Sequence, residues 1–347
     1  MIKKNDIDKM MDALMLRYWG IFSIDDNYRQ TVKASNYFKV QNSILNIEAD
    51  DSDTDCDKTV IAIAVPYALE GTTKPKQRNM AKVEAFGWDF DYHVQIKRLL
   101  TDIQSGMEML CGHPLSNVTL CVDTSPYNDR EVGFYAGLGL VGQHHLLIHE
   151  QLGSNIFIGY LVIHQKLPIE RSAQVMPEDL PKTISHPYCQ SCGRCAKACP
   201  SCVCGSEEAD MVLCLSAQTQ SKEILVETMR LAMHDRLYGC SVCQVVCPLN
   251  HNKMAHPLLT LKSENWLDAL ALLELTNQDF KYQYGHMGFT WRPLWIYKRN
   301  ALIVLGNTGD KAAYEALVKQ SHLTADEKLA EYYGWAITEI EKRLKKD

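Results

Sequence analysis

Short apolar runs and amphipathic stretches share the first half of the chain. Residues 59–66 and 115–122 are apolar runs with many β-branched residues, and they predict buried strands. The helical spacing of apolar residues between Ile7 and Tyr18 predicts a helix, and residues 94–110 predict a longer one. This part of the chain is therefore expected to combine helices and strands.

A glycine-rich run and a hairpin are predicted after these elements. A helix expected after residues 128–130 leads into Gly137-Leu-Gly-Leu-Val-Gly142, which matches the G-x-G-x-x-G order of dinucleotide sites. That motif normally follows a strand and opens a helix, whereas this run follows a helix and leads toward a strand. We interpret it as a tight turn where the backbone approaches something bulky. Residues 146–148 and 155–163 then predict a hairpin.

The last third of the chain has a helical pattern. Residues 168–187 are rich in proline and predict a connector to a cysteine-rich part. Helices are predicted at residues 266–275, 295–305, 311–320 and 324–345. One or two helix pairs of this kind resemble HEAT repeats but cannot form a long solenoid. The chain is thus expected to be an α+β protein with three parts, residues 1–180, 181–255 and 256–347.

Composition narrows the class of protein. The chain has 347 residues, of which 46% are hydrophobic and 22% charged, as in ordinary globular proteins. No apolar run approaches the roughly 18 residues that span a bilayer, and the first residues lack a signal peptide's apolar core, so we expect a cytoplasmic protein. A net charge of −6 argues against a broadly basic nucleic-acid surface. Thirteen cysteines fit a reducing compartment.

Eight cysteines carry the strongest chemical signal. The run Cys189-Gln-Ser-Cys192-Gly-Arg-Cys195-Ala-Lys-Ala-Cys199-Pro200 has the C-x2-C-x2-C-x3-C-P spacing of bacterial ferredoxins with two [4Fe-4S] clusters. In such a run three cysteines hold one cluster and the fourth holds the other. We therefore expect one cluster on Cys189, Cys192, Cys195 and Cys247, and a second on Cys199, Cys214, Cys240 and Cys243.

Other interpretations of these cysteines are structural zinc and disulfides. Zinc does not explain why both runs end in Cys-Pro, at Cys199-Pro200 and Cys247-Pro248. Cys202 and Cys204 add two thiols directly after the first run, and the sequence leaves their role open. Cys56, Cys111 and Cys121 are expected to be small buried hydrophobic residues.

Together these motifs resemble the epoxyqueuosine reductases, cobalamin- and iron–sulfur-dependent enzymes of queuosine synthesis in tRNA. The resemblance extends from about Thr59 to Asn307. Besides the eight cysteines it rests on Asp91-Tyr-His93, Val122-Asp-Thr-Ser-Pro126, Asp129-Arg130, Ala136-Gly-Leu-Gly139, Arg236-Leu-Tyr-Gly-Cys240, Cys247-Pro-Leu-Asn250, Arg299-Asn300 and Leu305-Gly-Asn307. It implies a nitroreductase-like corrinoid domain (1–180), a ferredoxin-like two-cluster domain (181–255) and short HEAT-like helices (256–347). Reductive dehalogenases share this core more distantly.

The resemblance implies that Asp123 is the proton donor beside a base-off cobalamin. Removing an epoxide oxygen as water takes two electrons and two protons, so an acid is needed next to the reduced cofactor. An aspartate with its reference pKa of about 4 is mostly ionised at pH 7, so burial against the corrin would have to raise it. The other interpretation of Asp123 is a helix cap after the strand, because Asp-Thr-Ser-Pro is also a capping sequence.

Further residues receive roles from the resemblance alone. Lys222 matches a position near tRNA, although most exposed lysines are merely solvated. Tyr92 and His93 are expected either to orient corrin or substrate, or to cap or pack the helix that follows. The residues implied to line the corrin, for which plain core packing is the alternative, are Leu147, Ile158, Ser216, Ser241 and Val242.

Some positions depart from the family pattern. Residues 201–205, Ser-Cys-Val-Cys-Gly, stand where the family usually has Thr-Gly-Ala, and Gln143 stands where it commonly has a lysine. The expected function is reduction of epoxyqueuosine in tRNA, with a low-potential donor such as flavodoxin or ferredoxin and a monomeric chain. The alternatives are a dehalogenase-like reductase of a small molecule, and an electron-transfer protein that reactivates a partner's corrinoid.

Overall fold

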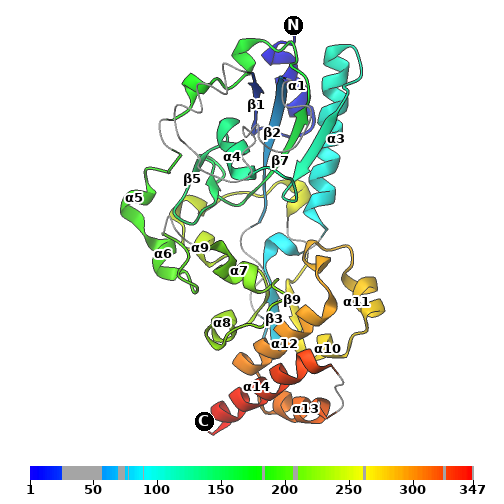
Figure 1. Cartoon of the computed structure of the whole chain (residues 1–347), viewed down its shortest axis with the longest axis vertical. Helices are drawn as coiled ribbons and strands as arrows, with labels where there is room; N and C mark the ends of the chain where they lie inside the picture. Colours follow the sequence, from blue (N-terminus) through cyan, green and yellow to red (C-terminus); the bar gives the residue numbers. More distant parts are fainter. Residues whose placement is uncertain are drawn as a thin grey trace. The chain divides into compact units, whose positions relative to one another are not determined.

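The computed structural model describes residues 1–25, 57–68, 75–76, 78–88, 90–181, 184–205, 210–260, 263–322 and 326–345 (Figure 1). Contacts divide the chain into two compact units made of interleaved segments. Unit 1 comprises Met1–Tyr67, His93–Gly193 and Cys247–Leu259, and unit 2 comprises Ala68–Tyr92, Arg194–Val246 and Thr260–Asp347. The boundaries of the three predicted domains do not coincide with this division by contacts, and the domains stay a prediction. Cys56 lies outside the described residues.

Unit 1 is built on a four-stranded antiparallel sheet. Its strand order is β1 (Trp19–Ile24), β2 (Lys58–Pro66), β7 (Ile156–Ile163) and β4 (Val118–Val122). Eight of the nine residues of β2 are buried, as expected for an apolar strand covered on both faces. The predicted strands at 59–66, 115–122 and 155–163 are confirmed, whereas β1 was not predicted.

Helices α3 (Tyr92–Cys111) and α4 (Asp129–Tyr135) cover opposite faces of this sheet (Figure 1). Successive residues of a strand point to opposite faces, so Gly159 and Ile158 of β7 distinguish the two sides. A Cβ added to Gly159 would lie 2.4 Å from Ile96 of α3, and one added to Gly133 of α4 would lie 3.2 Å from Ile158. Helix α1 (Lys4–Ala13) confirms the helix expected near the N-terminus.

The predicted glycine turn is confirmed, but the predicted hairpin is wrong. A Cβ added to Gly139 would lie 2.3 Å from the carbonyl oxygen of Ile148, so the backbone approaches another strand closely there. That strand, β6 (Leu147–Ile148), pairs with β5 (Leu140–Val141) and not with residues 156–163. The physical reason is that β7 is apolar over its whole length and becomes an inner strand of the main sheet, between β2 and β4.

Unit 2 has a three-stranded sheet and most of the helices. Strand β3 (Met80–Val83) lies between β8 (Arg236–Tyr238), to which it is parallel, and β9 (Trp266–Asp268), to which it is antiparallel. The helix predicted over 266–275 is wrong at its start, because residues 266–268 pair with β3 as a strand. The larger helices are α10 (Ala269–Glu274), α11 (Asn277–Tyr284), α12 (Leu294–Thr308), α13 (Lys311–Ser321) and α14 (Glu327–Leu344).

Helix α12 forms the centre of unit 2. It is buried on nearly every side from Ile296 to Gly306, as is usual for a helix inside a core. Helices α13 and α14 are antiparallel, since Tyr314 near the start of one bonds Glu341 near the end of the other. The predicted helices at 295–305, 311–320 and 324–345 are confirmed.

Short elements surround the cysteines. The short helices are α5 (Cys189–Cys192), α6 (Arg194–Ala198), α7 (Leu215–Gln218), α8 (Glu227–Met233) and α9 (Val242–Val245). Single 3-10 turns occur at Ala85–Gly87, Arg171–Ala173, Pro177–Asp179, Met211–Leu213, Pro248–Asn250, Pro257–Leu259 and Gly288–Trp291. Within the described part of the chain, no helix is both long and apolar enough to cross a membrane.

Candidate functional site

Asp123 occupies a strained and exposed position at the end of a strand. The residue before it, Val122, forms the last pair of β4 with β7. Asp123 itself has a φ of 54°, in the left-handed region that residues other than glycine seldom adopt. Its carboxylate lies 3.6 Å from His93 Nε2, and 63% of its side-chain surface is exposed. Strain of this kind is concentrated at functional sites.

Asp123 does not cap the helix that follows it. The N-cap of α4 is Asn128, whose side chain accepts hydrogen bonds from the backbone N–H groups of Arg130 and Glu131. Because Asn128 already satisfies these N–H groups, the capping interpretation of Asp123 loses its basis. His93 lies in the first turn of α3, where its ring faces Asp123, so it is positioned to orient that carboxylate.

A half-buried polar cluster holds the turn that carries Asp123. Ser125, two residues later, lies 2.5 Å from the hydroxyl of Tyr160 on β7, and that hydroxyl donates to Asp129 Oδ1 at 2.8 Å. Burial raises the pKa of Asp129 to about 6, although the bond from Tyr160 opposes the rise. The charge of Asp123 raises it further. Asp129 therefore becomes protonated at a higher pH than an ordinary aspartate.

This pKa predicts a pH-dependent effect of Asp129→Asn on stability. The pKa of the Asp129 carboxyl is higher in the folded protein than in the unfolded chain, so its protonated form stabilises the fold at low pH. This stabilisation is lost as the pH rises through about 6. Asparagine does not ionise, so we expect the variant to gain on the order of 2 kcal/mol relative to wild type at pH 8. The gain should shrink toward pH 4. Anaerobic thermal unfolding at several pH values measures it.

The matched control is Asp102→Asn, which removes an exposed carboxylate from α3. Its stability difference from wild type should not vary over the same pH range. An Asp129→Asn difference that is equal at pH 4 and pH 8 would show that this carboxyl is not perturbed by burial.

In unit 1, three of the predicted cluster ligands gather. The thiol of Cys247 is buried and lies close enough to Cys189 and Cys192 for their charges to affect it. Burial is the largest cause that raises the pKa of the Cys247 thiol, and the thiols of Cys189 and Cys192 raise it further. Cys189 and Cys192 belong to α5, which ends at Gly193 with a left-handed φ of 60°. The fourth predicted ligand, Cys195, belongs to the other unit, and the complete set stays a prediction.

In unit 2, thiols of the second predicted ligand set interact with one another in pairs. Cys214 interacts electrostatically with Cys199, and Cys240 with Cys214. Cys204 lies within hydrogen-bonding reach of both Cys243 and Cys199. Among the described residues no cysteine forms a disulfide.

The loop after Cys199 wraps around its thiol. Burial alone raises the pKa of this thiol, but hydrogen bonds from the backbone of Cys204 and Ser201 outweigh burial. The Ser201 hydroxyl contributes as well, at 3.7 Å from the sulfur. The net pKa lies below that of an ordinary cysteine. Hydrogen bonds to sulfur are among the features that set cluster potentials, so this environment fits a cluster ligand.

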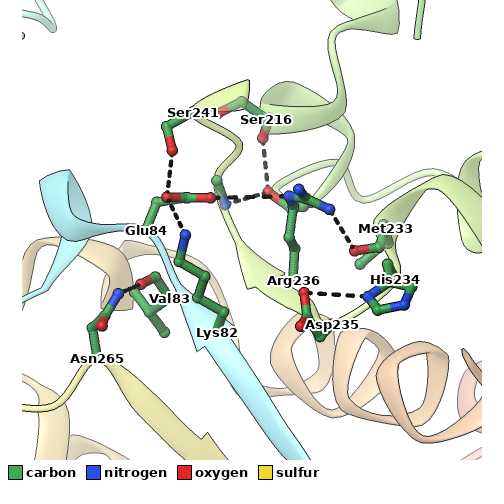
Figure 2. A network of polar contacts seen from close by, with 12 residues as sticks. Lys82, Val83, Glu84, Ser216, Met233, His234, Asp235, Arg236, Ser241 and Asn265 are labelled. Carbon is green, nitrogen blue, oxygen red and sulfur yellow. Dashed lines mark hydrogen bonds and ion pairs between the residues drawn. The ribbon is translucent and has the colours of Figure 1, made fainter. Parts of the chain in front are cut away.

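A buried carboxylate organises the polar residues next to Cys240. Figure 2 shows Glu84, which is 1% exposed, accepting a hydrogen bond from Ser241 at 2.6 Å. Lys82 lies 3.1 Å from the same carboxylate, and Arg236 lies 3.9 Å from it. The parallel pairing of β3 with β8 brings Lys82 and Arg236 side by side. The Ser241 hydroxyl is thus committed to Glu84.

Arg299 and Asn300 hold the loop that follows α7. Arg299 is fully buried, and burial lowers its pKa to about 10. Its guanidinium donates to the carbonyl oxygens of Ser221 and Glu223 at 2.7 and 3.2 Å. These two residues flank Lys222, which is exposed. Arg299 therefore fixes the backbone that presents Lys222 to solvent.

The residues expected to line a corrin fit that role unequally. Ile158, Ser216 and Val242 are half-buried, so each keeps surface that a ligand can contact. Leu147 is only 2% exposed and packs with Ile158 against Gly133 in the core of unit 1, and Ser241 is 3% exposed. The corrin-lining roles of all five residues stay a prediction.

Several site residues could not be assigned a role from the sequence. Glu84 has no motif around it, and Tyr160 lies within an apolar strand. The Arg299-Asn300 pair contributes to the resemblance, which implies no role for it. Its signal in the sequence is an arginine followed by an asparagine within a largely apolar stretch.

Residues 188–250 match the family model of the 4Fe-4S double cluster binding domain. An epoxyqueuosine reductase of Lactococcus garvieae is 32% identical over 292 residues, which are 82% of this chain and 79% of that protein. The solved epoxyqueuosine reductase of Streptococcus thermophilus is 25% identical, with a TM-score of 0.75 over 98% of this chain and 90% of that one. A second epoxyqueuosine reductase, solved with an epoxyqueuosine-modified tRNA-Tyr stem loop, is 22% identical, with a TM-score of 0.71 over 97% and 98%.

These findings agree with the double-cluster spacing of the cysteines and with a mixed helix and sheet fold. The relative from Lactococcus garvieae is 32% identical over most of both chains. This chain belongs to the epoxyqueuosine reductase family.

Proposed function

We propose that this protein reduces epoxyqueuosine in tRNA to queuosine. The observation that carries the proposal is the exposed, strained Asp123 at a strand end in a family member that also has a double-cluster domain. Loss of the epoxide oxygen as water consumes two electrons and two protons. The clusters account for electron supply, and a carboxyl group at Asp123 accounts for proton supply.

Electrons would enter through the two clusters. Cys189, Cys192, Cys195 and Cys247 are proposed to hold one, and Cys199, Cys214, Cys240 and Cys243 the other. The gathering of Cys247 with Cys189 and Cys192, and of Cys199 with Cys214, supports these sets. A low-potential protein such as flavodoxin or ferredoxin would be the donor, and the chain would act as a monomer.

Cobalamin is the proposed second cofactor. When bound, it would supply two-electron chemistry at carbon, which one-electron clusters do not. Ile158, Ser216 and Val242 are the residues proposed to contact it, because each keeps accessible surface. His93 would hold the Asp123 carboxyl in place as that group gives its proton to the departing oxygen. The nitroreductase-like, ferredoxin-like and HEAT-like descriptions of the three parts belong to the same proposal.

The tRNA would be bound in part through Lys222. A lysine on a fixed backbone is suited to a phosphate, since it makes the contact without first ordering a loop. Arg299 supplies that fixed backbone. The related enzyme solved with a modified tRNA stem loop supports a tRNA substrate here. The net charge of −6 implies that any basic contact surface is local.

The test is an anaerobic assay of the reconstituted protein with cobalamin, a strong reductant and epoxyqueuosine-containing tRNA, with nucleosides identified by mass spectrometry. We expect conversion of epoxyqueuosine to a product lighter by one oxygen. No conversion by protein whose corrinoid is reduced through the clusters would contradict the tRNA role. That result would favour reduction of a small molecule.

A further inference from the structure

The segment after Cys199 carries two cysteines in opposite environments. Cys202 is exposed and has a left-handed φ of 56°. Cys204, two residues later, is only 9% exposed. The segment turns at Gly205, where an added Cβ would lie 2.8 Å from the Cβ of Ala196 in α6. The backbone therefore packs against α6, and Cys204 is enclosed while Cys202 faces solvent.

Cys204 lies among the thiols that we assign to the second cluster. Its thiol is within hydrogen-bonding reach of Cys243 and of Cys199. Cys214 interacts electrostatically with both Cys199 and Cys204, and Cys240 interacts with Cys214. Pairwise interactions thus connect five thiols of unit 2, whereas a [4Fe-4S] cube has four iron corners.

We propose that Cys204 is an exchangeable fifth ligand of the second cluster, which binds iron in place of Cys243 or Cys199. These are the two predicted ligands within hydrogen-bonding reach of its thiol, so Cys204 would be next to any iron that they hold. In the exchange the iron–sulfur bond to Cys243 breaks as the bond to Cys204 forms. The proton of Cys204 passes to the departing thiolate. Charge and oxidation state are unchanged, so no oxidant or reductant is needed.

This inference goes beyond the proposed function, because it depends on the double-cluster domain and not on the substrate. Its consequence is that the second cluster tolerates the loss of one ligand. The first cluster serves as the reference, and Cys189→Ala gives the result for a ligand that Cys204 does not replace. Iron content and spectra report on the exchange even if epoxyqueuosine is not the substrate.

The experiment counts iron and sulfide in full-length variants after anaerobic reconstitution. We expect about eight iron atoms in wild type and in Cys243→Ala, and about four in the double variant Cys243→Ala/Cys204→Ala. Cys189→Ala should also fall to about four. The matched control, Cys243→Ala/Cys202→Ala, should keep about eight because Cys202 faces solvent. Alanine is used because a serine oxygen can itself bind iron.

A count of about four in Cys243→Ala alone would overturn the proposal, as would a count of about eight in the double variant. Far-UV circular dichroism establishes that each variant is folded. A second measurement avoids removing any of the eight ligands. Cys204→Ala should keep about eight iron atoms but lose them to a chelator severalfold faster than wild type, while Cys202→Ala should match wild type. Equal rates for the two single variants would also overturn the proposal.

Discussion

Replacing Asp123 with asparagine is expected to slow epoxyqueuosine reduction by at least about a hundredfold while both clusters stay in place. A positioned general acid typically contributes 10²–10⁴ in rate, and an amide cannot donate the proton that the departing oxygen requires. Asparagine tolerates the left-handed conformation at this position nearly as well as aspartate, so the turn should keep its shape. Mass spectrometry of the product measures the loss of activity, and the iron content shows whether both clusters are still in place.

Asp102→Asn is again the control, because it removes one exposed carboxylate from unit 1 without touching the turn. It should retain the wild-type rate. If Asp123→Asn also reduced its clusters normally and worked at the full rate, Asp123 would not be the proton donor. A chain that only carries electrons to a partner's corrinoid would then be the better interpretation.

Arg299→Met should produce the largest loss of stability. Methionine fills a similar volume but leaves part-buried carbonyl oxygens without donors, among them those of Ser221 and Glu223. Each unsatisfied buried group costs about 1–3 kcal/mol, so a total loss of at least about 3 kcal/mol is expected. Thermal unfolding of the reconstituted protein should show a midpoint lower by roughly 5 °C or more.

Arg98→Met is the matched control, since Arg98 is exposed on α3 and its loss should change the midpoint little. The tRNA proposal adds a second readout. Lys222→Ala should weaken tRNA binding without changing the unfolding midpoint, whereas Arg299→Met should change both. An Arg299→Met protein as stable as wild type would mean that the loop does not depend on this guanidinium.

The sequence predicted the elements whose signal is local. Strand β2 and helices α3, α12 and α14 have long apolar patterns, and each was expected within a few residues of its observed bounds. Strands β3 and β8 were missed because a segment of three or four residues is too short to show a pattern of alternating apolar and polar residues. Their pairing partners also lie far away in the chain. The hairpin predicted between residues 146–148 and 155–163 is wrong for a similar reason, because the residue pattern of a strand does not show which strand it pairs with.

The candidate site was predictable to different degrees. The cysteine spacing indicated iron–sulfur clusters without any knowledge of the fold, because three ligands of one cube follow one another closely in the run from Cys189 to Cys195. The Ser125, Tyr160 and Asp129 cluster was not predictable, because pairing of β4 with β7 brings Tyr160 to a turn more than 30 residues away. The buried Glu84 depends in the same way on β3 lying beside β8.

The interleaving of the two units also sets the order in which the chain can fold during its synthesis. Ser241 lies 157 residues after Glu84, its hydrogen-bond partner. At about 5–20 residues per second a ribosome needs roughly ten to thirty seconds to make that stretch. Strand β3 therefore leaves the ribosome long before β8 and β9 are synthesised. Until then its backbone N–H and C=O groups lack their partners in the sheet. Complete ligation of the second cluster must likewise wait for Cys240 and Cys243, which follow β8 directly in the chain.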